Sequence, residues 1–253
     1  MFLAIDVGNT QTAIGVFDDI ELVDHWRLSS GRERTKDEFS IMLRGLLEPA
    51  GYDPSAFTGA AMSSVVPPVA IALQDALGEV VNADVIVVGP GVKTGLAIKI
   101  DNPREVGADR VVNSVGARAK YGSPVVVVDF GTATTFDVVD ADGDYIGGAI
   151  SPGLEVSMDA LVAATASLRR VDLVEPRSVV GKGTVEAIQS GLLYGYAALV
   201  DGMIERIAVE MGPAPVVATG GIAPTIVPLC EAVVTVDESL TLDGLRLIWE
   251  LNQ

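Results

Sequence analysis

The sequence is poor in the side chains that build many catalytic and metal centres, with one cysteine and one histidine among its 253 residues. Cys230 alone cannot form a disulfide within the chain and excludes a cysteine metal site, and a single cysteine fits a reducing compartment. His25 lies beside Trp26 in an expected strand, where a structural role is favoured over a catalytic one. Chemistry is therefore sought among carboxylates, hydroxyls and glycines.

Long apolar runs are lacking as well. No stretch approaches the roughly 18 residues of a membrane span, because Asp6, Asp84, Asp129 and scattered glycines and prolines interrupt every candidate. The N-terminus has no basic leader and no long apolar core, so it is predicted to be a first strand and not a signal peptide. We therefore expect a cytoplasmic protein that does not enter the membrane.

Basic residues are scarce, with 17 Lys and Arg against 34 Asp and Glu and a formal net charge of -17. A field of this sign repels nucleic acid and anionic membranes, so neither is expected as a partner. It also repels phosphate ligands, and a site for one must supply backbone N–H groups, a metal ion and a few arginines. The favoured explanation of the charge itself is solubility or adaptation to a salty cytoplasm.

Apolar residues are abundant, at 49% of the chain, which indicates a substantial buried core. The length suits one large domain or two compact ones. Strand-like runs alternate with helical segments, a pattern typical of α/β layers. The strands and helices that frame the motifs below are predicted at Phe2–Val7, Gln11–Phe17, Ile20–Leu28, 36–48, 102–120, Val125–Asp129 and 185–211.

An internal repeat is visible in the sequence. Residues 5–12 align without a gap with residues 128–135, pairing Asp6 with Asp129, glycine with glycine, and Thr12 with Thr135. Both segments follow an apolar strand and precede a further strand. We therefore predict two duplicated α/β halves, residues 1–115 and 116–253.

The turn after the first strand has the chemistry of a phosphate site. Gly8 permits close backbone approach, and Asn9, Thr10 and Thr12 supply hydrogen-bond donors. Asp6 can orient a water bound to Mg²⁺. An ordinary hairpin explains one copy equally well. The second copy favours phosphate binding, because a nucleotide cleft between duplicated halves needs a turn from each.

Three further glycine motifs have more than one interpretation. Asp129-Phe130-Gly131-Thr132 forms the second turn and suits a phosphate or a cation. Thr219-Gly220-Gly221 fits a contact with a purine or ribose and a plain strand-to-helix turn equally well. Gly181-Lys182-Gly183-Thr184 lacks P-loop spacing and by itself indicates only a loop.

Gly107-Ala108-Asp109-Arg110 is the most unusual part of the helix predicted at 102–120, since a glycine inside a helix is destabilising. A ligand close to the backbone would explain the glycine. Arg110 can hold a carboxylate or an amide oxygen, and Asp109 can accept a proton from an attacking hydroxyl. A surface Asp-Arg pair is the alternative.

Taken together, Asp6–Thr10, Gly107–Arg110, Asp129–Thr132 and Gly181–Thr184 resemble the corresponding motifs of type III pantothenate kinase. Their order and spacing, and the chain length, are similar to that family over nearly the whole chain. The resemblance implies the duplicated actin and hexokinase fold, with two ribonuclease H-like halves and an ATP cleft between them. It also implies transfer of the γ-phosphate of ATP to the primary hydroxyl of pantothenate, giving 4'-phosphopantothenate in the first step of coenzyme A biosynthesis.

The resemblance further implies where the nucleotide and its ions bind. Thr132 would contact ATP from the second half, Asp129 would bind a monovalent cation, K⁺ or NH₄⁺, and Mg²⁺ would accompany ATP. The residues implied to wrap the ATP phosphates are Asp6, Val7, Gly8, Asn9, Thr10, Gln11, Thr12 and Ala13.

Pantothenate would lie on Gly107, Ala108, Asp109 and Arg110, with Asp109 as the proton acceptor. Thr184 would reach it across a homodimer interface that includes the helix at 185–211. One position departs from the family. Ile100 stands where many members carry a tyrosine, so the tyrosine's substrate contact is not carried over to this position.

Two other functions fit parts of the sequence. A sugar or small-acid kinase shares the same duplicated fold, because the fold does not fix the acceptor. A nucleotide-binding regulator without catalytic activity is a further possibility, but it gives Asp109 no role. The Gly107–Arg110 segment favours the pantothenate kinase.

Overall fold

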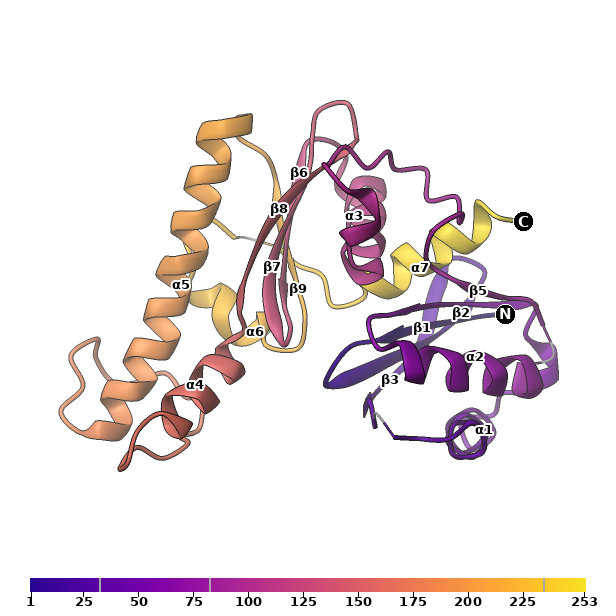
Figure 1. Cartoon of the computed structure of the whole chain (residues 1–253), viewed down its shortest axis with the longest axis horizontal. Helices are drawn as coiled ribbons and strands as arrows, with labels where there is room; N and C mark the ends of the chain where they lie inside the picture. The colour runs from indigo at the N-terminus through magenta and orange to yellow at the C-terminus, as the bar shows by residue number, and fades with distance from the viewer. Residues whose placement is uncertain (32, 82, 234) are drawn as a thin grey trace. The chain divides into compact units, whose positions relative to one another are not determined.

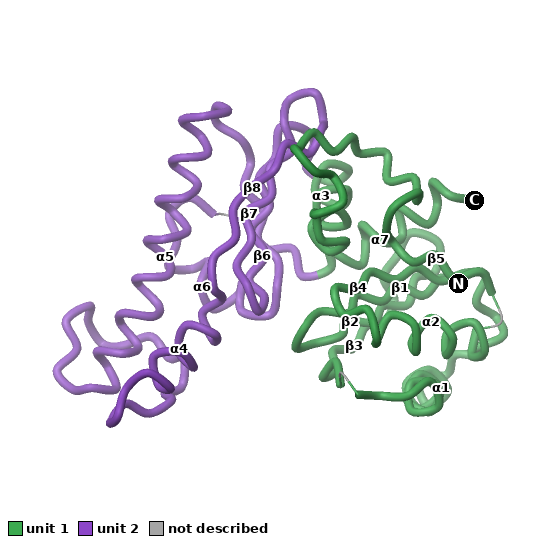
Figure 2. The backbone as a smooth tube through the Cα atoms, in the orientation of Figure 1, with its two compact units in different colours: residues 1–120, 239–253 green, residues 121–238 purple. Residues whose placement is uncertain are grey.

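The computed structural model describes residues 1–31, 33–81, 83–233 and 235–253. Contacts divide the chain into two compact units (Figure 2). Unit 1 comprises residues 1–120 and 239–253, and unit 2 comprises residues 121–238.

Unit 1 is built on a five-stranded sheet in the order β3-β2-β1-β4-β5 (Figure 1). The first three strands form an antiparallel meander, and β4 and β5 continue it in parallel with β1. The bounds of its elements are β1 Phe2–Val7, β2 Gln11–Asp18, β3 Glu21–Ser29, α1 Lys36–Leu47, β4 Gly59–Ser64, α2 Pro67–Val81, β5 Val85–Val87, α3 Ala108–Tyr121 and α7 Leu240–Glu250, with 3-10 turns at Pro54–Ala56 and Pro103–Glu105.

Alternation along β1 gives the two faces of this sheet different partners. Leu3, Ile5 and Val7 belong to the core that α1 and α2 complete. On the opposite face, the Phe2 ring lies 4.8 Å from the ring of Trp249 on α7. Because successive side chains of a strand point to opposite faces, β1 contributes to a core on each side of the sheet.

Unit 2 has a second five-stranded sheet, in the order β10-β9-β6-β7-β8. The long helix α5 packs on it through Leu193, Tyr196 and Val200, which share a core with Val126 and Val128 of β6. The bounds are β6 Val125–Phe130, β7 Ala133–Val139, β8 Tyr145–Pro152, α4 Leu154–Ala163, α5 Thr184–Met211, β9 Val216–Thr219, α6 Ala223–Ile226 and β10 Thr235–Val236, with a 3-10 turn at Val227–Leu229.

The two sheets confirm the predicted duplication. In each, a central strand pairs with an antiparallel meander on one side and with two parallel strands on the other. The gapless alignment is wrong by one residue beyond the turn, however. Thr12 pairs with Val7, and the corresponding partner of Phe130 is Thr134, not Thr135. The second turn is one residue shorter, so the strand after it starts one residue earlier.

The units also divide the chain differently from the expected boundary at residue 115. Helix α3 continues to Tyr121 as an uninterrupted element of unit 1, apart from its last residue. The C-terminal helix α7 belongs to unit 1 as well, because Leu240, Leu242, Leu245 and Ile248 are buried there. A helix at the chain end thus returns to cover the first sheet.

Candidate active site

The first turn is held in shape by a residue that no motif marks. Gly8 donates its N–H to the carbonyl of Gln11 at 3.0 Å, closing the link between β1 and β2. Ser30, just after β3, donates its N–H to the carbonyl of Thr10 at 3.0 Å and its hydroxyl to the carbonyl of Gly8 at 2.6 Å. Its Oγ also lies 3.1 Å from Oγ1 of the buried Thr12. The turn is fixed from below, and Asn9, Thr10 and Gln11 are left exposed.

Asp6 lies at the end of β1, directly beneath this turn. Its Oδ1 accepts a hydrogen bond of 2.6 Å from the hydroxyl of Ser63, which occupies the paired position on β4 and is fully buried. Burial raises the pKa of Asp6 to about 7; the Ser63 hydrogen bond opposes this rise, and the nearby charge of Asp109 adds to it. Two carboxylates from distant segments therefore share one electrostatic environment in unit 1.

Asp109 lies in the first turn of α3. The backbone N–H of Arg110 donates to its Oδ1 at 2.8 Å. Burial raises the pKa of Asp109, while the N–H and the charge of Arg110 oppose that rise. A carboxylate with a raised pKa is a better proton acceptor than an ordinary one, and the helix N-terminus favours its negative charge.

The prediction of one continuous helix over 102–120 is wrong, and with it the argument that Gly107 interrupts a helix. A 3-10 turn covers Pro103–Glu105, and α3 begins only at Ala108. Gly107 immediately precedes the helix, and its carbonyl accepts the N–H of Val111 at 3.2 Å. A β-carbon here would collide with Oδ1 of Asp109. The glycine makes room for the carboxylate that turns back over it.

The second turn, in unit 2, is tighter and is backed by glycines. Gly131 donates its N–H to the carbonyl of Ala133 at 3.1 Å, and the carbonyl of Thr132 accepts the N–H of Gly153 at 3.0 Å. Thr132 itself is exposed at the tip. The turn thus presents a hydroxyl and backbone groups on a fixed support.

Gly220 lies against the base of this second turn. Its φ is +96°, and a β-carbon on it would come within 2.6 Å of Oδ1 of Asp129 and of the carbonyl of Phe130. The strand-to-helix interpretation of Thr219-Gly220-Gly221 therefore has a physical basis within the protein. Thr219 pairs with Asp129 across the parallel strands, as Ser63 pairs with Asp6 in unit 1.

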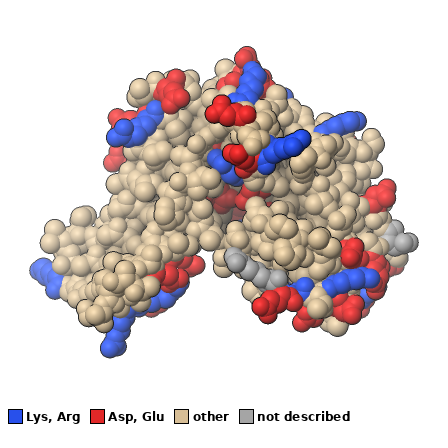
Figure 3. All heavy atoms as spheres, in the orientation of Figure 1, with Lys and Arg blue, Asp and Glu red and all other residues tan. Residues whose placement is uncertain are grey.

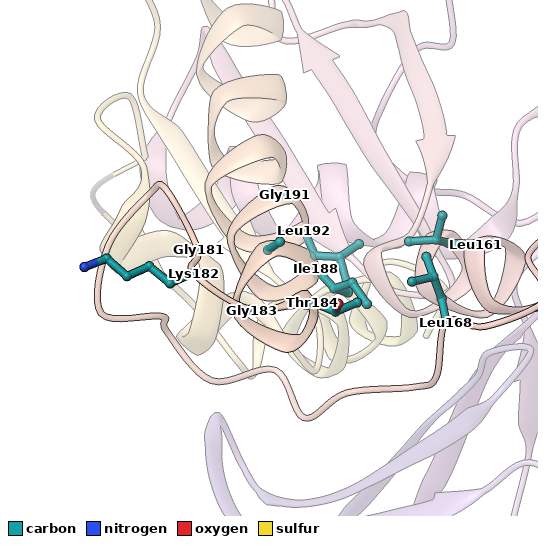
Figure 4. A pocket seen from close by; sticks show the side chains of 10 residues that line it. Leu161, Leu168, Gly181, Lys182, Gly183, Thr184, Ile188, Gly191 and Leu192 are labelled. Atoms are coloured by element: carbon teal, nitrogen blue, oxygen red, sulfur yellow. The ribbon is translucent and has the colours of Figure 1, made fainter.

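Thr184 is the first residue of α5 and is exposed. It lines a groove of about 720 Å³ in unit 2, together with Gly181, Lys182 and Gly183 (Figure 4). The rest of the lining is mainly apolar and comes from Leu161, Leu168, Ala187, Ile188 and Leu192. One polar hydroxyl at the edge of an apolar groove suits an amphipathic ligand or a protein surface.

The predicted site residues fall into two groups. Asp6–Ala13 and Gly107–Arg110 lie in unit 1, as does Ile100, which is partly buried. Asp129, Thr132 and Thr184 lie in unit 2. Within the described ranges, no group of three or more His, Cys, Asp or Glu side chains could hold a metal ion.

The surface agrees with the low count of basic residues. On the face seen in Figure 3, basic and acidic side chains are interspersed, and the basic ones do not form a continuous stripe. Such a stripe is what a nucleic-acid surface needs. Among the helices of the described residues, none has the length and apolar character to cross a membrane.

Known proteins similar to this chain fall into one family by sequence and one fold by structure. Residues 2–206 match the family model of type III pantothenate kinase. The type III pantothenate kinase of Anaeromyxobacter sp. strain Fw109-5 is 53% identical over 254 residues, which cover 100% of both chains.

Two solved structures share the fold at low sequence identity. A conserved protein of Campylobacter jejuni assigned to the Baf family of transcriptional activators has a TM-score of 0.62 at 18% identity, over 99% of this chain and 98% of that one. The inorganic polyphosphate/ATP-glucomannokinase of Arthrobacter sp. strain KM has a TM-score of 0.55 at 15% identity, over 100% and 99%. These similarities establish the fold alone. Evidence on the activity comes from the site and from the more similar relatives.

Proposed function

The chain belongs to the type III pantothenate kinase family, and from this premise we propose that it transfers the γ-phosphate of ATP to the primary hydroxyl of pantothenate. The product is 4'-phosphopantothenate, and the reaction is the first step towards coenzyme A. The observation that supports this best is the presence of two partly buried aspartates in unit 1, Asp6 beneath a turn rich in donors and Asp109 in the first turn of α3. One aspartate serves the phosphate side and the other serves the acceptor side.

The ATP phosphates lie, in this proposal, on the turn from Asp6 to Ala13. Gly8 and the exposed Asn9 and Thr10 offer backbone and side-chain donors to phosphate oxygens. The net charge of -17 makes such local donors necessary, because the overall field repels the nucleotide. Thr132 contributes a further contact from its own turn.

Pantothenate is held by Gly107, Ala108 and Arg110, and Asp109 takes the proton of its primary hydroxyl. Arg110 suits the carboxylate or an amide oxygen of the substrate. The raised pKa of Asp109 improves its basicity. In a loose phosphoryl-transfer transition state the proton leaves late, so orientation of the hydroxyl by Asp109 matters as much as its strength as a base.

The residues around the first turn fit a Mg²⁺ that arrives with ATP. Mg²⁺ in such sites keeps several waters and takes one or two carboxylates plus phosphate oxygens. Asp6 provides one carboxylate, with Oδ1 already held by Ser63. The described residues contain no larger cluster of acidic ligands, which matches an ion carried mainly by the nucleotide. Mg²⁺ supplies neutralisation of the phosphate charge.

We assign the monovalent cation, K⁺ or NH₄⁺, to Asp129. Its carboxylate lies one residue before the end of β6, next to the second turn. Oxygen ligands of this kind suit hard cations.

A homodimer, the second part of the proposal, is supported by exposed apolar side chains around the groove at Thr184. Val179, Val180 and Val185 are 66%, 80% and 55% exposed. Clustered exposed apolar side chains are a mark of protein interfaces. A second copy packed here would let Thr184 reach the partner's pantothenate.

The single cysteine is consistent with a protein that works in the reducing cytoplasm.

Release of ADP tests the activity directly. The purified protein is incubated with ATP and Mg²⁺, with pantothenate or a panel of sugars, in K⁺, NH₄⁺ or Na⁺. We expect ADP to be released with pantothenate and with none of the sugars. The release should be faster in K⁺ or NH₄⁺ than in Na⁺. Turnover with a sugar and none with pantothenate would replace the proposal with a sugar kinase.

Asp109→Asn tests the proton acceptor. We expect kcat to fall by at least about 100-fold, the lower end for a general base. Asp37→Asn is a matched control, because Asp37 is an exposed aspartate in the first turn of α1. Equal kcat values for Asp109→Asn and the wild type would remove Asp109 from the mechanism.

Light scattering gives the mass in solution, and a mass of one chain would refute the dimer.

A further inference from the structure

The chain between α4 and α5 is irregular but firmly attached to α5. Residues 172–183, here called the strap, contain no helix or strand and end in the Gly181–Thr184 turn. Four α5 side chains spaced along one side of the helix hydrogen-bond to it. The pairs are Glu186 with Arg177 and the Lys182 N–H, Gln189 with the Asp172 carbonyl, Ser190 with the Val179 carbonyl, and Tyr194 with Glu175.

Glu186 is the member of this set that holds the turn itself. Its Oε2 accepts the backbone N–H of Lys182 at 3.2 Å, and its Oε1 accepts Nε of Arg177 at 2.6 Å. The Arg177 hydrogen bond, and after it the Lys182 N–H, lower the pKa of Glu186. Each carboxylate oxygen therefore has its own partner, one at the middle of the strap and one in the turn.

The backbone fits the same arrangement. A β-carbon on Gly181 would come within 2.5 Å of the backbone nitrogen of Ala187. The turn thus packs directly on the first turn of α5, and its seat leaves no room for a side chain. Displacing the turn would move Lys182, Gly183 and Thr184 together.

The two bonds of Glu186 differ in the groups that they join to it. The Arg177 side chain is 84% exposed, and such an ion pair contributes little. The Glu186 side chain is only 23% exposed, and its bond to Lys182 is a charge-assisted bond to backbone. Of the two, the Lys182 bond is the one that joins Glu186 directly to the turn.

We propose that Glu186 is a positioning residue for the substrate site: it fixes the Gly181–Thr184 turn so that Thr184 meets pantothenate. This inference rests on the proposed contact between Thr184 and pantothenate. Glu186 touches no reacting atom. It acts through the backbone of the turn, so its loss raises the KM for pantothenate and spares the site for ATP.

The test compares KM and kcat for four variants. Glu186→Ala is expected to raise the KM for pantothenate about tenfold, the effect of one charge-assisted bond, with the KM for ATP unchanged. Glu186→Gln keeps one acceptor oxygen for the Lys182 N–H and recovers most of the loss. Arg177→Ala changes the KM by less than about threefold. Glu210→Ala, an exposed glutamate at the far end of α5, is the matched control.

A second measurement follows hydrogen exchange of the strap amides. Glu186→Ala is expected to speed exchange in residues 172–183, whatever Thr184 binds. If Glu186→Ala speeds exchange but Thr184→Ala leaves the KM for pantothenate unchanged, Glu186 does hold the strap in place, and the proposed contact between Thr184 and pantothenate is wrong. If Thr184→Ala raises that KM and Glu186→Ala does not, or if Glu186→Ala weakens both substrates equally, the positioning role is overturned.

Discussion

At the residue scale, Asp6, which the proposal places in the ATP site, carries a cost to stability. Its pKa of about 7 exceeds the ordinary value of 3.8, and burial is the main cause. Between these two pH values the folded protein keeps a proton that the unfolded chain has lost. Stability therefore falls as the pH rises through this window, and the full penalty is present above pH 7.

Asp6→Asn should consequently stabilise the protein while impairing catalysis. The gain is expected to be small near pH 4 and to grow to a few kcal/mol at pH 8, at about 1.4 kcal/mol per pKa unit. Urea unfolding at both pH values measures it, with the exposed Asp75→Asn as control. A gain that is the same at pH 4 and pH 8 would show that burial does not penalise the Asp6 charge.

Ser63→Ala addresses the same carboxylate through its hydrogen bond. The Ser63 hydroxyl lowers the pKa of Asp6 against the effect of burial, so its loss raises that pKa further. If catalysis needs ionised Asp6, the acid limb of the kcat profile moves to higher pH. A general loss of packing would lower kcat at every pH without moving the limb, and an unmoved limb would separate Ser63 from the Asp6 charge.

The contributions of Ser63 and Ser30 were not predictable from local motifs. Ser63 is 57 positions from Asp6 and meets it only because β1 and β4 pair in one register. Ser30 reaches the first turn from the end of β3. Aligning the strands of both halves would have given a hint, since a hydroxyl residue, Ser63 or Thr219, faces each aspartate.

At the scale of elements, the sequence singled out Gly107, but the structural reason that it suggested for a glycine there was wrong. Gly107 was expected inside a helix, but it lies before α3 and accommodates the Asp109 carboxylate. The helix predicted at 36–48 is present as α1, and the capping box of Thr35 and Glu38 that begins it is a signal confined to four consecutive residues. A local pattern located the start of α1 but not that of α3, and contacts across a turn do not appear in such patterns.

Gly220→Ala tests the second turn. At a φ of +96° with backbone atoms of Phe130 2.6 Å from the new β-carbon, alanine is expected to lower the free energy of unfolding by about 2 to 3 kcal/mol. Gly45→Ala is the control, since Gly45 is exposed within α1 and an added β-carbon meets nothing there. That change should stabilise by up to about 1 kcal/mol. Similar effects of the two substitutions would refute the close approach at Gly220.

At the scale of the whole molecule, the two units have separate cores, and the tryptophan side chains report on only one of them. Both tryptophans, Trp26 and Trp249, lie in unit 1. Tryptophan fluorescence therefore records the unfolding of unit 1, whereas circular dichroism records helices of both units. The two probes can distinguish joint from separate unfolding.

Leu245→Ala removes a fully buried side chain of α7 in unit 1 and should cost about 2 to 5 kcal/mol. The fluorescence midpoint is expected to fall. Leu193→Ala is the matched change in the core of unit 2, and it should move the fluorescence midpoint less than the dichroism midpoint. Equal shifts by both probes for both variants would mean that the chain unfolds as one cooperative unit.

The sequence by itself determined the α/β alternation, the duplication and the family, and it predicted a phosphate-binding role for the two turns. These properties depend on residue periodicity and on motifs within a few consecutive residues. Only the tertiary structure decided the one-residue offset between the turns, the return of α7 to unit 1, and the partners of Asp6 and Gly181. Each of these depends on strand register or on packing between segments far apart in the chain, where no local pattern carries the information.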